Sequence, residues 1–327
     1  MHSTLVDLQA LDLLSIDGED SKKFLQGQVS CDIDALTGSQ SLSGILCNIK
    51  GRTIADFRIF EYQHSCFLHF DTGVAEIAKS VLAKYIVFSN AEIVNAERRF
   101  SRFGLIGNDA HKLLDEIFGG YPVDDGAVIS IENHLLIKIP GLIPRYEIWQ
   151  DLAHDGDHGE DSSAILSLKD QSLIIGNHAW ELEDIKAGIA HITPAMIEQY
   201  LPEALNYDIS GPIDFNKGCY TGQEIVARMF YRGTAKKRLY HLYQSHCPIG
   251  PEAINSVGYQ NQQESVKNEI IKVVTTEEGD CHLLVILPTE AVANDASFYL
   301  NDQTDLLLEV RTLPYEGLQS TTLKPGK

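Results

Sequence analysis

The sequence predicts an α+β protein that ends in a small all-β barrel or sandwich. Two observations carry this prediction. Before Arg238, runs with the two-residue period of strands alternate with runs that have the 3.6-residue period of helices. After Arg238, only short strand-like runs remain, separated by glycines, prolines and acidic turns. The 327 residues, 44% hydrophobic and 22% charged, are enough for two or three folded domains.

The N-terminal half contains the clearest periodic runs. In the run 53–60, Ala55, Phe57 and Ile59 alternate with Asp56 and Arg58, which is the pattern of a half-buried strand. We expect, in order, the short helix 20–27, a hairpin of 45–48 and 53–60, the strand 66–70, the helix 74–85, the strand 103–107, the helix 110–118, and strands at 128–132, 135–139 and 146–149.

The region from 151 to 238 connects these runs to the C-terminal part. Residues 151–163 are acidic and contain His154 and His158, four apart, but Gly156 and Gly159 favour a solvated loop over a helix that would align the two for a metal. A helix is expected after Trp180, and further strands at 239–243, 270–274, 282–287 and 306–310. We therefore predict three domains, 1–150, 151–238 and 239–327.

Charge and cysteine content exclude several classes of protein. The net charge of −20 argues against stable non-specific nucleic-acid binding, which depends on Lys and Arg neutralising phosphates. No run approaches the roughly 18–20 apolar residues that span a bilayer, and the first residues lack the pattern of a signal peptide. The six cysteines form no CxxC pair, which fits neither a disulfide framework nor a zinc site. We expect a cytoplasmic protein that neither associates with a membrane nor contains a metal site.

The stretch 213–224 departs from this ordinary background. Ile213 and Phe215 predict a strand, and Gly218 and Gly222 then mark a tight turn around Cys219. A helical period begins after Gly222, so Cys219 is expected in a loop at a helix N-terminus. Such a position favours the thiolate, which is the reactive form of cysteine.

Basic residues gather in the same part of the chain. From Lys217 to Arg238 there are six Lys or Arg residues and a single carboxylate, Glu224. The simplest alternatives are that Cys219 is a small buried apolar residue and that the basic helix face is merely solvated. Glycines, thiol and cations together instead indicate an anion site beside a reactive cysteine.

These residues resemble a known signature. The run 217–224, Lys-Gly-Cys-Tyr-Thr-Gly-Gln-Glu, continuing through Arg228 to Arg232, resembles that of the YgfZ family, relatives of the aminomethyltransferase (T-protein) of the glycine cleavage system. The run 24–32 is also similar to T-protein relatives. The resemblance implies a T-protein-like folate-binding core with a C-terminal β-barrel, and tetrahydrofolate or another reduced folate as cofactor. It further implies support of iron–sulfur enzymes, including tRNA-modifying ones, as clients, with Cys219 as the functional residue.

Residue chemistry supplies candidate folate contacts. A pterin presents an amide and amino edge that Gln223 or Glu224 could pair with, and its anionic glutamyl tail suits a cation. The predicted cofactor-binding residues are Lys217, Tyr220, Gln223, Glu224, Arg228 and Arg232.

Two departures from T-protein bear on catalysis. T-protein carries paired aspartates in the strand after a lysine–glycine turn, one of them catalytic, whereas here Ala55 precedes a single Asp56. Lys186 stands where T-protein has a glutamate that holds the pterin. We therefore expect an accessory folate-binding protein, with Cys219 and Asp56 as the candidate catalytic residues. The alternatives are a folate-dependent one-carbon transferase that uses Asp56, and an interaction protein whose segment 228–238 docks an acidic partner or tRNA.

Overall fold

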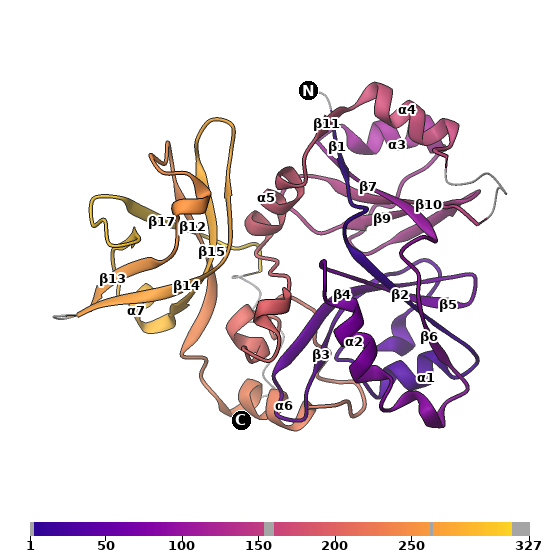
Figure 1. The fold of residues 1–327 in the computed structure, drawn as a ribbon, viewed down its shortest axis with the longest axis horizontal. Coiled ribbons are helices and arrows are strands. Elements are labelled where there is room, and N and C mark those ends of the chain that lie inside the picture. Colours follow the sequence, from indigo (N-terminus) through magenta and orange to yellow (C-terminus); the bar gives the residue numbers. More distant parts are fainter. Residues whose placement is uncertain (1–2, 154–159, 262–263, 316–327) are drawn as a thin grey trace. The chain divides into compact units, whose positions relative to one another are not determined.

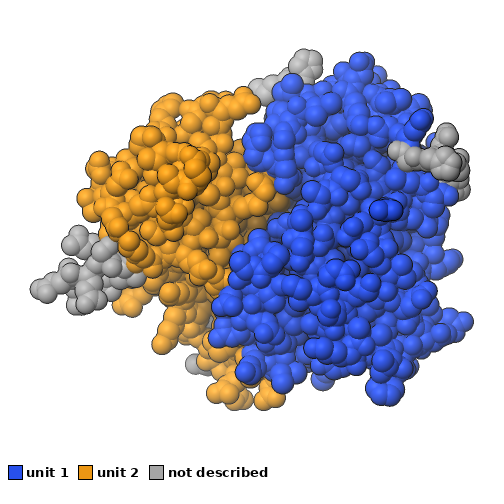
Figure 2. Space-filling view, viewed as in Figure 1, with its two compact units in different colours: residues 1–180, 191–199, 211–223 blue, residues 181–190, 200–210, 224–327 orange. Residues whose placement is uncertain are grey.

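The computed structural model describes residues 3–153, 160–261 and 264–315 (Figure 1). The chain forms two compact units, coloured separately in Figure 2. Unit 1 combines residues 1–180, 191–199 and 211–223, and unit 2 combines residues 181–190, 200–210 and 224–327. Each unit is thus assembled from stretches that are separated in sequence, and the predicted division at 150 and 238 stays a prediction.

Unit 1 contains two β-sheets. The six-stranded sheet has the order β11(Leu173–Ile175), β1(Thr4–Asp7), β7(Phe100–Ile106), β10(Arg145–Asp151), β9(His134–Ile139), β8(Val128–Ile131). The five-stranded sheet has the order β3(Leu42–Cys47), β4(Thr53–Tyr62), β5(Ser65–Phe70), β2(Asp12–Asp17), β6(Glu92–Asn95). All pairings are antiparallel except that of β1 with β11.

The helices of unit 1 cover the outer faces of the sheets. Figure 1 shows α3(Ala110–Phe118) and α4(Ser163–Gln171) over β7 and β10, and they share an apolar core with that sheet. The helices α1(Ser21–Gln26) and α2(Ala75–Leu82) pack with the apolar face of β4, which carries Ala55, Phe57 and Ile59. This confirms the predicted hairpin and amphipathic helix.

A third core lies between the two sheets. Phe60 of β4 contacts Trp149 of β10 at a ring distance of 4.9 Å, and Phe67 of β5 contacts Phe100 of β7 at 5.1 Å. The second face of β4 is therefore covered as well. Asp56, only 8% exposed, does not face solvent.

Unit 2 contains the C-terminal β-domain, which is a closed barrel rather than a sandwich. Its strands follow the order β12(Lys237–Gln244), β15(Cys281–Pro288), β14(Glu264–Thr275), β13(Val257–Asn261), β16(Phe298–Leu300), β17(Leu307–Arg311). The barrel core includes Leu242, Leu283 and Val285. The unit also contains α7(Thr289–Ala293), most of α5(His178–Ala187) and α6(Gln223–Arg232), and the turn 202–205. The predicted α+β class with a C-terminal barrel is confirmed.

The stretch 211–222 has no regular secondary structure. The strand predicted at Ile213 and Phe215 is wrong: the stretch 211–222 forms bends and turns, and one backbone bond, from the Asp214 N–H to the Ser30 carbonyl, ties it to the region after α1. His154 and His158 lie outside the described residues. None of the helices in the described ranges is long and apolar enough to cross a membrane.

Candidate functional site

Lys217 anchors the motif loop to unit 1. Its ammonium donates to the carbonyl oxygens of Gln26, Val29 and Cys31 at 3.0, 2.7 and 2.7 Å. Burial lowers the pKa of Lys217, but the three carbonyl dipoles satisfy all three donors of a charged amine. The position gives Lys217 a structural role, and its predicted contact with a folate tail stays a prediction.

Gly222 brings the loop onto the turn between β3 and β4. It has φ of +83°, and a Cβ at this position would lie 2.4 Å from the Asn48 carbonyl oxygen and 3.2 Å from the Gly51 Cα. Only glycine permits both the left-handed backbone and this close approach. Two residues earlier the chain is also buried, at Tyr220, so the loop is held on both sides of Thr221.

Cys219 is exposed on this fixed loop, four residues before α6 begins at Gln223. By contrast, burial raises the pKa of Cys31 and Cys47 to about 12. Cys66 and Cys281 are also buried, and Cys247 is half-buried. The alternative that Cys219 is a small buried residue is therefore wrong, and its sulfur is open to reagents or partners.

Tyr220, the residue after Cys219, carries a buried polar atom without a partner among the described residues. Tyr220 is only 7% exposed, and Lys217 Nζ lies 5.5 Å from the centroid of its ring. Within the described ranges its hydroxyl has no hydrogen-bond partner, and burial raises the pKa of Tyr220. Gln223 is half-buried at the start of α6, whereas Glu224, Arg228 and Arg232 are exposed on that helix in unit 2. The folate contacts predicted for these residues stay predictions.

A buried polar cluster lies between the two sheets of unit 1, centred on Glu147 of β10. Its carboxylate accepts hydrogen bonds from Arg58 Nε at 3.3 Å and Trp149 Nε1 at 3.1 Å, and lies 3.9 Å from His69 Nδ1. The Glu147 side chain is 4% exposed and that of Arg58 13%. A carboxylate has about four acceptor positions, so Glu147 keeps acceptor capacity.

The same cluster contains donors without acceptors. Arg102 of β7 is 1% exposed; its Nη2 donates to the Gln9 carbonyl at 2.8 Å, while its Nε and Nη1 have no partner among the described residues. His69 Nε2 is equally unsatisfied there. Both side chains contact the Trp149 ring, and burial lowers the pKa of each. Unsatisfied buried donors of this kind indicate a place for a bound group or ordered water.

Asp56 is paired in a way that the sequence did not reveal. Its Oδ2 lies 2.7 Å from His191 Nδ1, and its Oδ1 accepts from the Ile192 N–H at 2.6 Å. Asp56 stands two residues from Arg58 on β4, so both belong to the same face of the strand. The His191 side chain is 40% exposed. The pair therefore connects the buried side of β4 with the surface.

Sequence reasoning missed His69, Arg102, Glu147 and His191. For the first three a signal existed, because each is a charged or titratable residue inside a predicted or actual strand whose neighbours are apolar. Nothing near His191 in the sequence pairs it with a residue 135 positions away. In the part of the chain that the structure describes, no three His, Cys, Asp or Glu side chains form a metal site.

Two known proteins with sequences similar to this chain share one name. No family model matches the chain. The tRNA-modifying protein YgfZ of Hamiltonella defensa is 30% identical over 285 residues, which cover 87% of this chain and 83% of that protein. The protein of the same name from Colwellia psychrerythraea is 30% identical over 318 residues, covering 95% and 93%.

A solved structure accounts for the fold. The glycine cleavage system aminomethyltransferase T from Bartonella henselae matches 96% of this chain and 86% of its own, with a TM-score of 0.77 and 15% identity. Since identity of 30% extends over most of the two relatives above, and the fold is that of aminomethyltransferase T, the chain belongs to the YgfZ family of tRNA-modifying proteins.

Proposed function

We propose that this protein binds a reduced folate in unit 1 and supports the assembly or repair of iron–sulfur enzymes, including enzymes that modify tRNA. Cys219 is the working thiol of this proposal. In this proposal both the protein and the iron–sulfur enzymes that it supports are cytoplasmic. The observation that carries the proposal is the buried cluster around Glu147, with its unsatisfied donors.

The cluster fits the chemistry of a pterin. Glu147 offers a carboxylate to the amide and amino edge of the ring, while Arg102 Nε and Nη1 and His69 Nε2 offer donors to its carbonyl and ring nitrogen atoms. The rings of Trp149 and His69 pack edge to face with centroids 4.9 Å apart, and they add an apolar wall to the cluster. When bound, the folate would supply one-carbon chemistry, and these residues would bind and orient it.

Cys219 suits transient handling of sulfur or iron. Its thiolate would bind iron, or attack the outer sulfur of a persulfide and release the donor's thiolate. The loop keeps the sulfur exposed because Lys217 and Gly222 fix the backbone on either side of it.

Titration with tetrahydrofolate, followed by thermal unfolding, tests the binding. A ligand at 100 times its dissociation constant adds about 2.7 kcal/mol to the free energy of unfolding. Replacing Glu147→Gln should weaken binding at least about tenfold, since one charged acceptor is worth about 1.5–3 kcal/mol. Glu61→Gln, which changes a carboxylate paired with Lys22 elsewhere on β4, is the matched control. Equal affinity in both variants would remove Glu147 from the site.

Cys219→Ala tests the thiol in cells that lack the native protein. We expect loss of support for an iron–sulfur tRNA-modifying enzyme, measured as modified nucleoside in total tRNA, with unchanged thermal stability. Cys247→Ala, at the half-buried cysteine of unit 2, should behave as wild type. Full support by the Cys219 variant would exclude the thiol from the mechanism.

One-carbon transfer remains a second candidate because Asp56 and His191 form a close pair. A carboxylate that fixes an imidazole tautomer is a common arrangement for moving protons. Purified protein given tetrahydrofolate and an aminomethyl donor should then form a folate product, and Asp56→Asn should reduce the rate by about 100-fold or more. Absence of turnover in wild type would leave only the binding role.

A further inference from the structure

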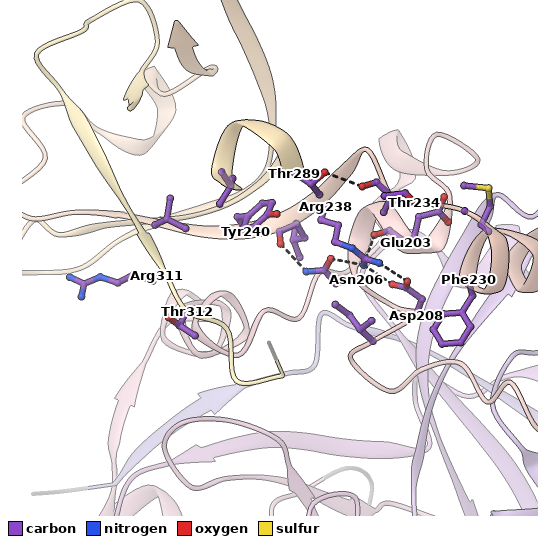
Figure 3. A pocket seen from close by; sticks show the side chains of 17 residues that line it. Glu203, Asn206, Asp208, Phe230, Thr234, Arg238, Tyr240, Thr289, Arg311 and Thr312 are labelled. Carbon is purple, nitrogen blue, oxygen red and sulfur yellow. Dashed lines mark hydrogen bonds and ion pairs between the residues drawn. The ribbon is translucent and has the colours of Figure 1, made fainter. Parts of the chain in front are cut away.

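Unit 2 contains a cavity of about 540 Å³ that the folate proposal does not use (Figure 3). All the residues that line it belong to unit 2. They come from the turn 203–209, the end of α6 with the segment that follows it, β12, α7 and the end of β17. The volume lies in the range of about 300–1,000 Å³ that small-molecule sites occupy.

One wall of the cavity is fixed by internal bonds. Arg238 donates to both carboxylate oxygens of Asp208 at 2.9 and 2.8 Å and to Asn206 Oδ1 at 3.3 Å (Figure 3). Asn206 Nδ2 in turn donates to the Leu239 carbonyl at 2.8 Å. These groups already satisfy one another, so they shape the wall rather than recognise a ligand.

Glu203 is a polar lining residue whose side chain lies outside this network. Its backbone carbonyl accepts from Arg238 Nη1 at 3.2 Å, but its carboxyl bonds to no other side chain in the described residues. Burial raises the pKa of Glu203, with the charge of Asp208 acting in the same direction. A half-buried carboxyl of this kind is a good acceptor for an exocyclic amino group.

An aromatic ring also lines the cavity, and three cations that do not line it are neighbours in sequence of residues that do. Phe230, on the last turn of α6, lines the cavity, and so do Gly233, Thr234 and Ala235. Exposed cations flank this segment in the chain, at Arg232, Lys236 and Lys237. Their charge suits phosphate, and an aromatic ring suits any flat base.

We propose that this cavity binds a nucleotide whose base carries an exocyclic amino group. The base would stack on Phe230 and pair through its amino edge with Glu203, while the phosphate would contact Lys236 or Lys237. The nucleotide is either free or an unpaired residue of an RNA strand, which share this chemistry. The inference does not depend on folate binding in unit 1.

Equilibrium titration of the full chain at low salt tests the proposal. The probes are GMP, CMP, AMP and UMP, and single-stranded RNA pentamers of each base. We expect the three bases with amino groups to bind more tightly than uracil, and Glu203→Gln to reduce that preference, because the amide keeps one uncharged acceptor in place of a carboxylate. Phe230→Ala should weaken binding about tenfold, in the range of one base–aromatic stack.

The cations provide a separate readout. Lys236→Ala with Lys237→Ala should lower the magnitude of the slope of log K against log salt on the RNA pentamers by about 0.7 for each phosphate contact that is lost. Lys267→Ala, an exposed lysine of the barrel paired with Asp302, is the matched control. An RNA pentamer that binds at least about tenfold more tightly than its mononucleotide identifies RNA as the source, whereas equal affinities identify the free nucleotide.

Three results would overturn the proposal. The first is that the folded protein binds none of the probes at about 1 mM, the weak end of specific affinity. The second is binding that Glu203→Gln and Phe230→Ala leave unchanged. The third is displacement of the nucleotide by tetrahydrofolate with the affinity that tetrahydrofolate has for unit 1. Thermal unfolding of each variant shows whether it is folded. If Phe230→Ala does not fold, Glu203→Gln alone decides, because it keeps the shape of the side chain.

Discussion

The two polar sites of this molecule satisfy their charges in different ways. In unit 1 the Arg58–Glu147 pair is largely buried between two sheets, and the neighbouring Arg102 keeps N–H groups without partners in the described structure. In unit 2 the Arg238–Asp208 pair lies beside an open cavity, and its side chains are 21% and 5% exposed. A buried ion pair is costly to desolvate and contributes little net stability. Our proposal gives the cluster of unit 1 a role in binding, whereas the pair of unit 2 forms part of the cavity wall.

Removing one partner of each pair gives the largest expected effect. Glu147→Ala leaves Arg58 and the Trp149 N–H without an acceptor in the interior, which should cost about 3–5 kcal/mol in the free energy of unfolding. Asp208→Ala should cost less, about 1–3 kcal/mol, because Arg238 keeps the Glu203 carbonyl and Asn206 as acceptors. Urea unfolding monitored by hydrogen exchange in each unit measures both. Equal losses would contradict the distinction between the two sites.

Sequence periodicity predicts much of the fold. In β4 it predicts one face of the strand but not what covers the other. Alternation along β4 predicted the face that Ala55, Phe57 and Ile59 present to a core. It left Asp56 and Arg58 on a face expected to meet solvent, because the partner that covers them, Glu147, is 89 residues from Arg58 in the chain. Local patterns define one side of a strand, but only the packing of a second sheet defines the other.

The motif was predicted in part. Two glycines around Cys219 predicted a turn with an accessible thiol, and Cys219 is exposed. The sequence predicts that Lys217 is an anion-binding group, yet it donates to three carbonyl groups near residue 29. The three carbonyl groups come from the end of α1 and the residues after it. Their convergence depends on the backbone path there, which the residue pattern does not predict.

The glycines of the motif offer a second, smaller test. Gly222→Ala places a methyl group 2.4 Å from the Asn48 oxygen at a φ of +83°, so we expect a loss of about 2 kcal/mol or more and a mobile loop. Gly218→Ala is the matched control, because no atom lies within 4 Å of a Cβ there. Its effect should stay within about 0.5 kcal/mol. Limited proteolysis near Cys219 and thermal unfolding compare the two variants. Similar behaviour would show that the loop does not depend on the turn beneath it.

The smallest expected effect is a pH dependence in the barrel. His241 Nε2 and His282 Nδ1 lie 3.0 Å apart in its wall, and burial lowers the pKa of each histidine to about 4. In the unfolded chain each histidine has its ordinary pKa of about 6.5. Between pH 6.5 and 4 the unfolded state therefore binds more protons than the folded state. Stability is therefore complete above pH 6.5 and falls as the pH drops, by roughly 1 kcal/mol per histidine between pH 7 and 5.5.

Replacing both histidines by glutamine isolates this contribution. The side-chain amides keep a hydrogen bond in the barrel wall but do not titrate in this range. Unfolding of the barrel, followed by hydrogen exchange at pH 7 and 5.5, should then lose most of its pH dependence, whatever the absolute stability of the variant. Unit 1 serves as the internal reference, because burial lowers the pKa of His69 there and the variant leaves that residue intact. A barrel whose pH dependence persists without His241 and His282 would assign it to other groups.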